Sequence, residues 1–225
     1  MSVTDVTVSY GATLAIEHAT FTVPVGSVMG LIGPNGAGKS TIIKAGLELM
    51  DHTGDVRFFG KPLEEVRRKV AYMPQVAAVD WDYPITVEQV VTMGMYTELG
   101  WLRRANAAHR SRVMEVLDRV GIADLAKRQI SELSGGQRRR VFVARILVQA
   151  PELYLLDEPF AGVDAASERV IRGVLHELRD QGATIVIVHH DLSTVAELCD
   201  HVTILNREII ATGPTSEAFT RENIT

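Results

Sequence analysis

The sequence predicts an α/β fold with a parallel sheet at its core, and two observations support this prediction. Short apolar segments of strand length recur along the chain, and helical patterns separate several of them. In addition, one apolar segment runs into a glycine-rich loop that leads directly into a helical pattern. Apolar strands that alternate with helices are typical of a parallel sheet covered by helices on both faces.

The N-terminal part of the chain predicts antiparallel strands instead. Polar and apolar residues alternate over residues 3–9 and 21–23, and again over residues 55–59. This two-residue period is typical of strands with one buried face. We therefore expect an N-terminal antiparallel β subdomain beside the core.

Five further segments predict the strands of the core. They are short and apolar, and they cover residues 28–32, 69–73, 153–156, 184–188 and 202–205. A helix is predicted over residues 164–180, with Gly182 at its end. A second, short helix is predicted over residues 216–220.

The middle of the chain is mainly helical in pattern. Apolar residues recur at helical spacing, as at Val87, Val90 and Val91. A chain of 225 residues suits one large domain with such an insertion. The expected parts are the core with its β subdomain at 1–76 and 151–225, and an inserted helical subdomain at 77–150.

Composition and charge exclude several classes of protein. The net charge of −5 gives no basic footprint for nucleic acid, so we expect no nucleic-acid partner. Cys199 is the single cysteine, which rules out an internal disulfide and fits a reducing compartment. No apolar run approaches the roughly 20 residues of a membrane helix, so a membrane role would require a partner chain. Three short basic clusters are predicted to be solvated surface: 67–69, 103–104 and 138–140.

The most informative segment is the loop at residues 33–41, GPNGAGKST, which matches the phosphate-binding pattern G-x-x-x-x-G-K-[ST]. Its glycines allow backbone N–H groups to approach phosphate oxygens, and Lys39 adds a positive charge near the β- and γ-phosphates. The Ser40 hydroxyl can bind Mg²⁺. The alternative is a glycine-rich turn without a ligand. The predicted phosphate-binding residues are Gly33, Asn35, Gly36, Gly38, Lys39, Ser40 and Thr41.

Two carboxylates, Asp157 and Glu158, end the apolar segment that starts at Leu153. In phosphate-loop ATPases the Asp at such a strand end helps to hold Mg²⁺, and an adjacent Glu can orient the attacking water. The alternative is an acidic turn after a strand. The phosphate loop upstream favours the catalytic interpretation.

A third motif, Leu133 to Gln137, reads LSGGQ and precedes an amphipathic helix. Ser134 with Gln137 has the form of a helix capping box, which is the structural alternative. However, Gly135 and Gly136 each cost about 1 kcal/mol inside a helix relative to Ala. They leave the first N–H groups of the helix open, which would suit a γ-phosphate.

These three motifs occur in the order typical of the ATP-binding cassette (ABC) family, which this chain resembles over nearly its whole length. LSGGQ is a highly specific signature of that family. The resemblance implies a RecA-like phosphate-loop core, ATP and Mg²⁺ as cofactors, and the ATPase activity of an ABC transporter's ATP-binding subunit.

The resemblance also implies roles for residues matched by position. Tyr10 would stack on adenine, Gln75 would contact Mg²⁺ and the attacking water, and His190 would contact the γ-phosphate. The alternatives are core packing for Tyr10 and a surface position for Gln75. The resemblance implies three catalytic residues, Glu158, His190 and Gln75. It implies that Mg²⁺ is held by Ser40, Gln75 and Asp157. The signature residues that it implies bind nucleotide are Ser134, Gly135, Gly136 and Gln137.

Some departures from the common family pattern indicate one branch. His189 stands where many cassettes have Thr, and we expect it to be a core histidine. Asp164 keeps the position of a family residue that contacts the second subunit. Residues 79–87, 99–101, 157–164 and 188–192 together resemble the cassettes of bacterial manganese, zinc and iron importers that work with a substrate-binding lipoprotein. The manganese-type members are the most similar.

The resemblance further implies a set of partners. Two copies would pair head to tail, with each ATP between Lys39 and Ser40 of one chain and residues 134–136 of the other. An integral membrane permease would hold the pair at the cytoplasmic face of the cell membrane, and an extracytoplasmic metal-binding protein would act indirectly. The seven His and one Cys are spread out, so the transported metal is expected to pass through the permease.

A contact with the permease is expected near Trp81, Tyr83 and Pro84, which follow Gln75 as in related cassettes. Exposed aromatic residues there would act as interface anchors. The alternative is that they pack in the core of the helical subdomain.

Other functions remain as alternatives. The cassette would serve import of an iron chelate or another solute, or act as a soluble ABC ATPase in DNA repair or translation. The chain has neither the inserted coiled coil of repair types nor the second cassette of translation types. A regulatory module without hydrolysis would be expected to lose Glu158 or His190.

Many relatives extend beyond Thr225, which fits either a natural short form or a trimmed chain.

Overall fold

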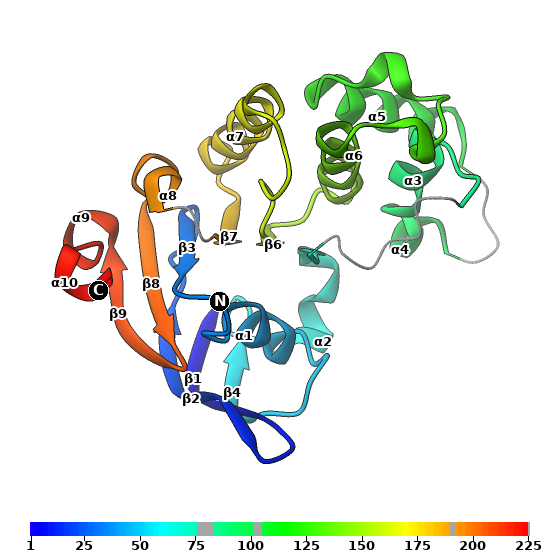
Figure 1. Ribbon diagram of the computed structural model, residues 1–225. Helices are drawn as coiled ribbons and strands as arrows, with labels where there is room; N and C mark the ends of the chain where they lie inside the picture. The colour runs from blue at the N-terminus through cyan, green and yellow to red at the C-terminus, as the bar shows by residue number, and fades with distance from the viewer. Residues whose placement is uncertain (76–82, 101–104, 190–191, 225) are drawn as a thin grey trace.

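The computed structural model describes residues 1–75, 83–100, 105–189 and 192–224 (Figure 1). These residues form two sheets. The larger has six strands in the order β5-β6-β7-β3-β8-β9, and all neighbours are parallel except β8 and β9. Its strands are β3 (Val28–Ile32), β5 (Val70–Met73), β6 (Leu153–Asp157), β7 (Thr184–Val188), β8 (His201–Asn206) and β9 (Glu208–Pro214). The predicted parallel core is therefore confirmed.

The smaller sheet is antiparallel, in the order β2-β1-β4, and consists of β1 (Ser2–Tyr10), β2 (Thr13–Thr22) and β4 (Thr53–Arg57). This confirms the antiparallel N-terminal strands, but β2 is much longer than the predicted 21–23. Strand β9 was not predicted at all. It is the edge of the larger sheet, and its residues alternate between exposed and half-buried because successive side chains point to opposite faces.

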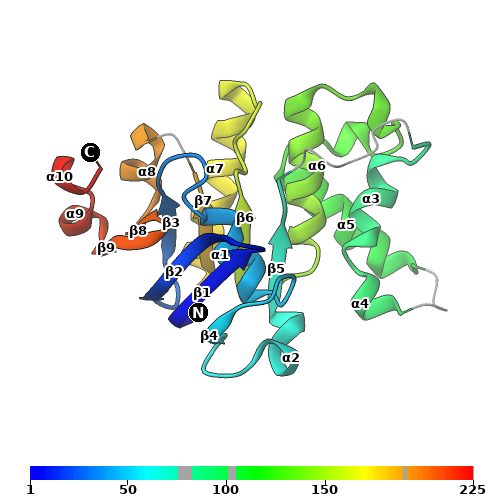
Figure 2. The ribbon, with the colours of Figure 1, turned by 60° about the horizontal axis from the view of Figure 1, so that its bottom comes forward.

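Helices cover both faces of the larger sheet. Helix α1 (Lys39–Gly46) and the small sheet lie on one face, and α7 (Ala165–Asp180) and α8 (Leu192–Leu198) lie on the other (Figures 1 and 2). Side chains along one strand alternate between the two sides: Leu153 and Leu155 of β6 pack toward α1, while Tyr154 and Leu156 belong to the opposite cluster. The sheet is therefore buried on both faces, as continuous apolar strands predict.

The predicted helical segment is confirmed between β5 and β6. It contains α3 (Val87–Met93), α4 (Tyr96–Leu99), α5 (Ala107–Arg119) and α6 (Gly135–Leu147), and α6 packs against α3, α5 and α7. These helices lie to one side of the sheet in both views (Figures 1 and 2). Their apolar core is nevertheless continuous with one face of the sheet, because a single cluster joins residues of α3, α5 and α6 to residues of β6 and β7.

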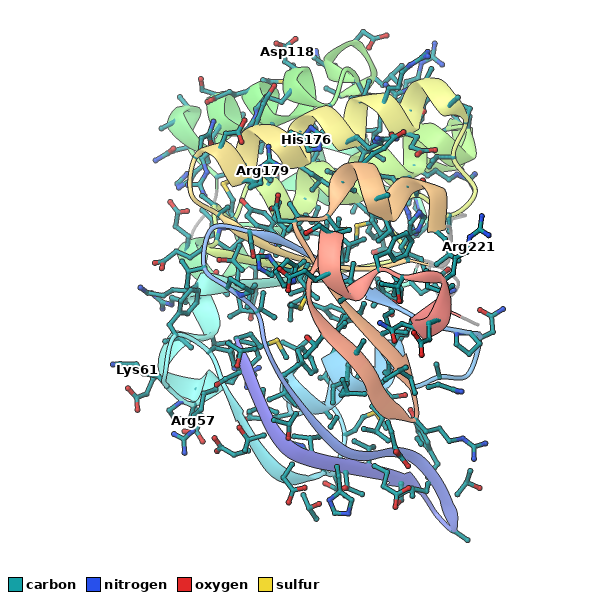
Figure 3. All side chains as sticks on the ribbon, turned by 90° about the vertical axis from the view of Figure 1, so that its left-hand side faces the viewer. Arg57, Lys61, Asp118, His176, Arg179 and Arg221 are labelled. Atoms are coloured by element: carbon teal, nitrogen blue, oxygen red, sulfur yellow. The ribbon has the colours of Figure 1, made fainter. Side chains whose placement is uncertain are left out.

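The remaining helices are short: α2 (Leu63–Val66), α9 (Thr215–Ala218) and α10 (Arg221–Ile224). Charged side chains such as Arg57, Lys61 and Arg221 project from the outer surface (Figure 3). Across the described residues, no helix has both the length and the apolar character needed to cross a bilayer.

Gly94 allows α3 to approach α6 closely, and this contact gives a prediction for stability. A Cβ at Gly94 would lie 2.1 Å from the backbone oxygen of Arg145 and 2.6 Å from Cγ1 of Val148. Gly94→Ala should lower the free energy of unfolding by about 1–3 kcal/mol, because the helices must move apart. Urea denaturation followed by circular dichroism measures this change.

Gly173→Ala in α7 is the matched control. A Cβ at Gly173 meets nothing within 4 Å, so this substitution should be neutral or should stabilise by up to about 1 kcal/mol. An equal effect of both substitutions would contradict the proposed close approach of α3 and α6.

Candidate nucleotide-binding site

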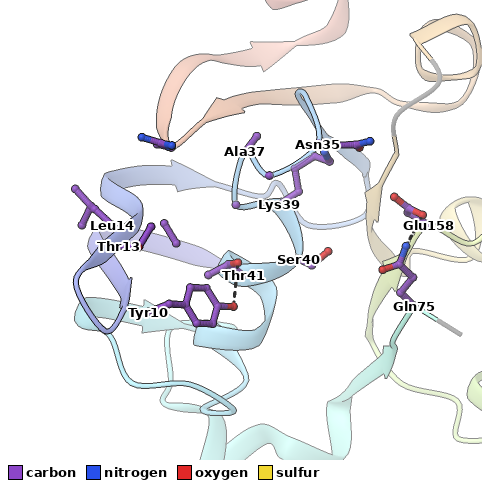
Figure 4. A pocket seen from close by; sticks show the side chains of 14 residues that line it. Tyr10, Thr13, Leu14, Asn35, Ala37, Lys39, Ser40, Thr41, Gln75 and Glu158 are labelled. Carbon is purple, nitrogen blue, oxygen red and sulfur yellow. Dashed lines mark hydrogen bonds between the residues drawn. The ribbon is translucent and has the colours of Figure 1, made fainter. Parts of the chain in front are cut away.

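A cleft of about 640 Å³ lies at the carboxyl ends of the central strands (Figure 4). In sheets of this kind, the loops that leave the carboxyl ends of neighbouring strands meet at one edge and form binding sites. The loops after β3 and β6 do so here. The cleft is lined by Tyr10, Thr13, Leu14, Ala15, Asn35, Gly36, Ala37, Gly38, Lys39, Ser40, Thr41, Gln75, Glu158 and Arg207.

The loop between β3 and α1 contains three glycines with positive φ angles, and two of them are required by neighbouring atoms. A Cβ at Gly33 would lie 1.9 Å from the backbone oxygen of Leu205. A Cβ at Gly38, the N-cap of α1, would lie 2.7 Å from Cγ1 of Ile16. A Cβ at Gly36 would meet nothing within 4 Å, so only its φ of 81° favours glycine there.

Lys39 is buried inside this loop. Its Nζ donates hydrogen bonds of 2.8 Å to the backbone oxygens of Gly33 and Pro34. Burial lowers the pKa of the Lys39 ammonium, and the charges of Glu158 and Asp157 partly oppose that shift. An anion that reaches this loop would meet a cation that is poorly solvated and already held in place.

Ser40 and Asp157 meet across the sheet. Ser40 Oγ donates a hydrogen bond of 2.9 Å to Asp157 Oδ1, although the two residues are 117 positions apart. Asp157 is 1% exposed. Burial raises the pKa of its carboxyl, and the hydrogen bond from Ser40 opposes that shift. A hydroxyl and a carboxylate at this spacing fit Mg²⁺, which prefers oxygen ligands.

Glu158 and Gln75 form the second polar pair. Gln75 Nε2 donates a hydrogen bond of 2.9 Å to Glu158 Oε2 (Figure 4). Glu158 has a φ of 51°, which is unusual for a residue other than glycine. Gln75 is exposed in the loop after β5, as the surface alternative expects, but it also lines the cleft and contacts Glu158.

Tyr10 lies at the mouth of the cleft. Its hydroxyl is 3.4 Å from Thr41 Oγ1 and donates to Met50 Sδ at 3.4 Å, while the residue stays 53% exposed. The alternative of a core tyrosine is therefore wrong. An aromatic face in this position is available for stacking against a planar ligand.

The signature motif lies outside the cleft of its own chain. Ser134 is the N-cap of α6, and both bonds of the capping box are present: Ser134 N to Gln137 Oε1 at 2.9 Å and Gln137 N to Ser134 Oγ at 3.3 Å. Gly136 has a packing reason, because a Cβ there would lie 2.7 Å from Asp164 Oδ2. The structural alternative, a helix capping box at the start of α6, is therefore confirmed. Ser134 and Gly135 are nevertheless exposed.

The structure also assigns positions to the neighbouring residues. His189 is buried, as predicted, with its ring 5.3 Å from that of Phe160 in an edge-to-face arrangement. Asp164 caps α7, since its Oδ1 accepts from the backbone N–H groups of Ala166 and Ser167. His190, Asp191 and Trp81 lie outside the described residues.

Sequence reasoning missed two groups near the site. Arg139 belongs to a cluster predicted to be solvated, but it is buried and donates to the backbone oxygens of Glu158 and Pro159. Arg207 lines the cleft from the turn between β8 and β9. Both depend on contacts between distant segments, and no local pattern in the sequence signals them.

The parallel sheet, the glycine loop before α1 and the carboxylates after β6 define the class of phosphate-loop nucleotide-binding proteins. The family model described as ABC transporter matches residues 16–161. This chain belongs to the ABC transporter family.

Similar proteins cover almost the whole chain. The zinc transport system ATP-binding protein TroB of Treponema pallidum is 48% identical over 225 residues, which is 100% of this chain and 85% of TroB. The manganese transport system ATP-binding protein MntB of Halalkalibacterium halodurans is 46% identical over 224 residues, 100% of this chain and 90% of MntB. A solved ATP-binding cassette of an ABC transporter in its ADP conformation has a TM-score of 0.80 and 26% identity, covering 97% of this chain and 93% of that one.

The burial of Asp157 gives a prediction about the stability of the nucleotide-free protein. Asp157→Asn removes a buried charge and keeps an oxygen that can accept from Ser40. Because burial raises the pKa of Asp157 in the folded state, the charged form costs stability at neutral pH. The substitution should therefore raise the unfolding midpoint of the nucleotide-free protein at neutral pH.

The sign of the pH dependence follows from the same shift. As the pH falls through the raised pKa of Asp157, the carboxylate of the folded wild type takes up a proton. The loss of stability caused by its buried charge then disappears. The difference between variant and wild type should therefore shrink toward acidic pH. Urea denaturation at several pH values measures it, and a variant that is less stable at neutral pH would contradict the prediction.

Proposed function

We propose that this chain is the ATP-hydrolysing subunit of an ABC importer that takes up a divalent metal ion through a separate membrane permease. Manganese is our first assignment, with zinc and iron as alternatives. The observation that carries the proposal is the cleft in which the phosphate loop, the Ser40–Asp157 bond and the Gln75–Glu158 bond converge. Identities of 48% and 46% to zinc and manganese transport ATP-binding proteins, over the whole of this chain, support the choice of cargo.

The nucleotide would bind along the loop that starts α1. Backbone N–H groups of residues 33–41 and the Lys39 ammonium would hold its phosphates, with Gly33, Asn35, Gly36, Gly38 and Thr41 shaping the loop. Tyr10 would stack on the adenine ring from the mouth of the cleft. The exposed ring of Tyr10 and the buried ammonium of Lys39 support these roles.

Ser40, Gln75 and Asp157 would hold Mg²⁺, which neutralises charge on the β- and γ-phosphates. Glu158 would accept a hydrogen bond from the attacking water and hold it in line with the γ-phosphate. Gln75 would fix the direction of the Glu158 carboxylate, since it already donates to Oε2. His190 would contact the γ-phosphate, as the family resemblance implies.

A second copy of the chain would complete the site. Ser134, Gly135, Gly136 and Gln137 lie at the start of α6, outside the cleft of their own chain, and this placement supports a role toward a nucleotide held by the partner. Two nucleotides between two copies would favour the closed pair, because they bind it more tightly than the separate chains. Hydrolysis would remove that preference, and the pair would open.

The permease would contact the region that follows Gln75. Tyr83 is 59% exposed there, and Met93 and Tyr96 on the nearby helices are also exposed. Exposed aromatic residues are typical anchors of protein interfaces. This contact would hold the chain at the cytoplasmic face of the membrane, where it would serve an extracytoplasmic metal-binding protein indirectly. Residues 77–150 would act as the helical subdomain that transmits the movement.

Glu158→Gln tests the hydrolytic mechanism. The variant keeps the size and polarity of the side chain but loses the base, so kcat should fall about 100-fold or more while ATP affinity stays close to that of the wild type. The trapped nucleotide should also shift the protein to a dimer in size-exclusion chromatography with MgATP. Lys39→Ala is the control, because it should lose nucleotide binding and stay monomeric. Near-normal turnover by Glu158→Gln would show that Glu158 does not have this role.

Uptake measurements test the cargo. In a strain that lacks this gene, uptake of radiolabelled manganese should fall, and the wild-type gene should restore it. The Glu158→Gln gene serves as the matched negative control. Restoration of zinc or iron-chelate uptake alone would reassign the cargo, and unchanged uptake of all three would contradict a role in metal import.

A further inference from the structure

Arg139 is a buried cation whose position no part of the proposed mechanism explains. It lies on α6, five residues after Ser134, and is 4% exposed. A buried guanidinium is costly unless its donors are satisfied. Burial lowers the pKa of Arg139 to about 10, and the charges of Glu158 and Asp157 oppose that shift. The side chain therefore stays charged at neutral pH.

The guanidinium donors of Arg139 reach the peptide groups that follow β6. Nε donates a hydrogen bond of 3.0 Å to the backbone oxygen of Pro159, and Nη2 donates to the backbone oxygen of Glu158. A planar guanidinium that holds two successive carbonyls fixes the direction of both peptide planes. Helix α6 is thereby tied to the turn that carries Glu158.

The turn at Glu158 needs such support. A φ of 51° is unfavourable for a residue with a side chain, and it persists only where the surroundings hold it. Glu158 N donates to the backbone oxygen of Val188 at 3.0 Å, and Glu158 O accepts from Ala161 N at 3.1 Å as well as from Arg139. The left-handed conformation directs the Glu158 side chain into the cleft, where it meets Gln75.

We infer that Arg139 is a positioning residue that holds the Glu158 peptide in its left-handed conformation and so sets the position of the carboxylate that orients water. The inference rests on the proposed role of Glu158 in hydrolysis. Because α6 begins at the signature motif, Arg139 also connects the end of the helix that would face the partner copy with the carboxylate of its own chain. A shift of α6 would move the backbone oxygen of Glu158 directly.

Substitution of Arg139 by Met keeps an apolar stem of similar length and removes both hydrogen bonds. Arg139→Met should lower kcat about 10- to 100-fold, since small displacements of a catalytic group have effects of this size. ATP affinity should stay within about twofold, because Arg139 does not line the cleft. Steady-state ATPase assays and equilibrium binding of a fluorescent ATP analogue to the purified chain measure the two effects.

Arg140→Met is the matched control. Arg140 lies on the same helix and also donates to two backbone oxygens, those of Val120 at 3.3 Å and Gly121 at 3.0 Å, but these lie beside α5 and not beside Glu158. Its loss should reduce stability to a similar extent while kcat stays within about twofold of the wild type. Equal losses of kcat in the two variants would overturn the inference.

A double variant separates positioning from a general structural role. If Arg139 acts through Glu158, Arg139→Met in the Glu158→Gln background should lower kcat by less than about twofold further. Arg139→Lys, which keeps the charge and one donor, should fold and recover part of the rate. Additive losses in the double variant, or an Arg139→Lys variant no faster than Arg139→Met, would overturn the inference. A wild type without ATPase activity would contradict the proposed function instead.

Discussion

The hydrogen bond from Ser40 to Asp157 is the contact on which the site depends, because it joins the start of α1, which follows β3, to the end of β6, and these two strands are not neighbours in the sheet. It exists only if β3, β7 and β6 lie parallel and in register, so that their carboxyl ends coincide. The price is a carboxylate buried in the protein interior, with its pKa raised. A stable core on both faces of the sheet tolerates this cost, and the charge is retained where a metal-bound phosphate would need it.

The glycines of the phosphate loop illustrate two different constraints. Gly33 and Gly38 are fixed by neighbours within the fold, the backbone of Leu205 and the side chain of Ile16. Gly36 has open space around its α-carbon, so its glycine is explained by backbone conformation and by access to the cleft. The glycines of this loop therefore meet two requirements: close packing within the fold, and open access of the backbone to the cleft.

Much of the fold and of the site could be predicted from the sequence, because the relevant signals are local. Apolar runs predicted the strands β3, β5, β6, β7 and β8. The loop pattern predicted Lys39 and Ser40, which line the cleft. What could not be predicted depends on distant partners. Strand β9 pairs only along one side and lacks a continuous apolar run, and the burial of Arg139 depends on backbone oxygens 19 and 20 positions away. Gly136 likewise reflects the approach of α7 and not only a ligand.

One apolar cluster joins α3, α5 and α6 to one face of the larger sheet, and it limits how these helices can move relative to the sheet. A hinge would open this cluster to water and lose the hydrophobic stabilisation of many side chains at once. A shear motion, in which packed side chains slide past one another by small steps, keeps the cluster closed. A movement driven by nucleotide would therefore be a small sliding rotation of α6 along the sheet, in which interior contacts are exchanged and not broken.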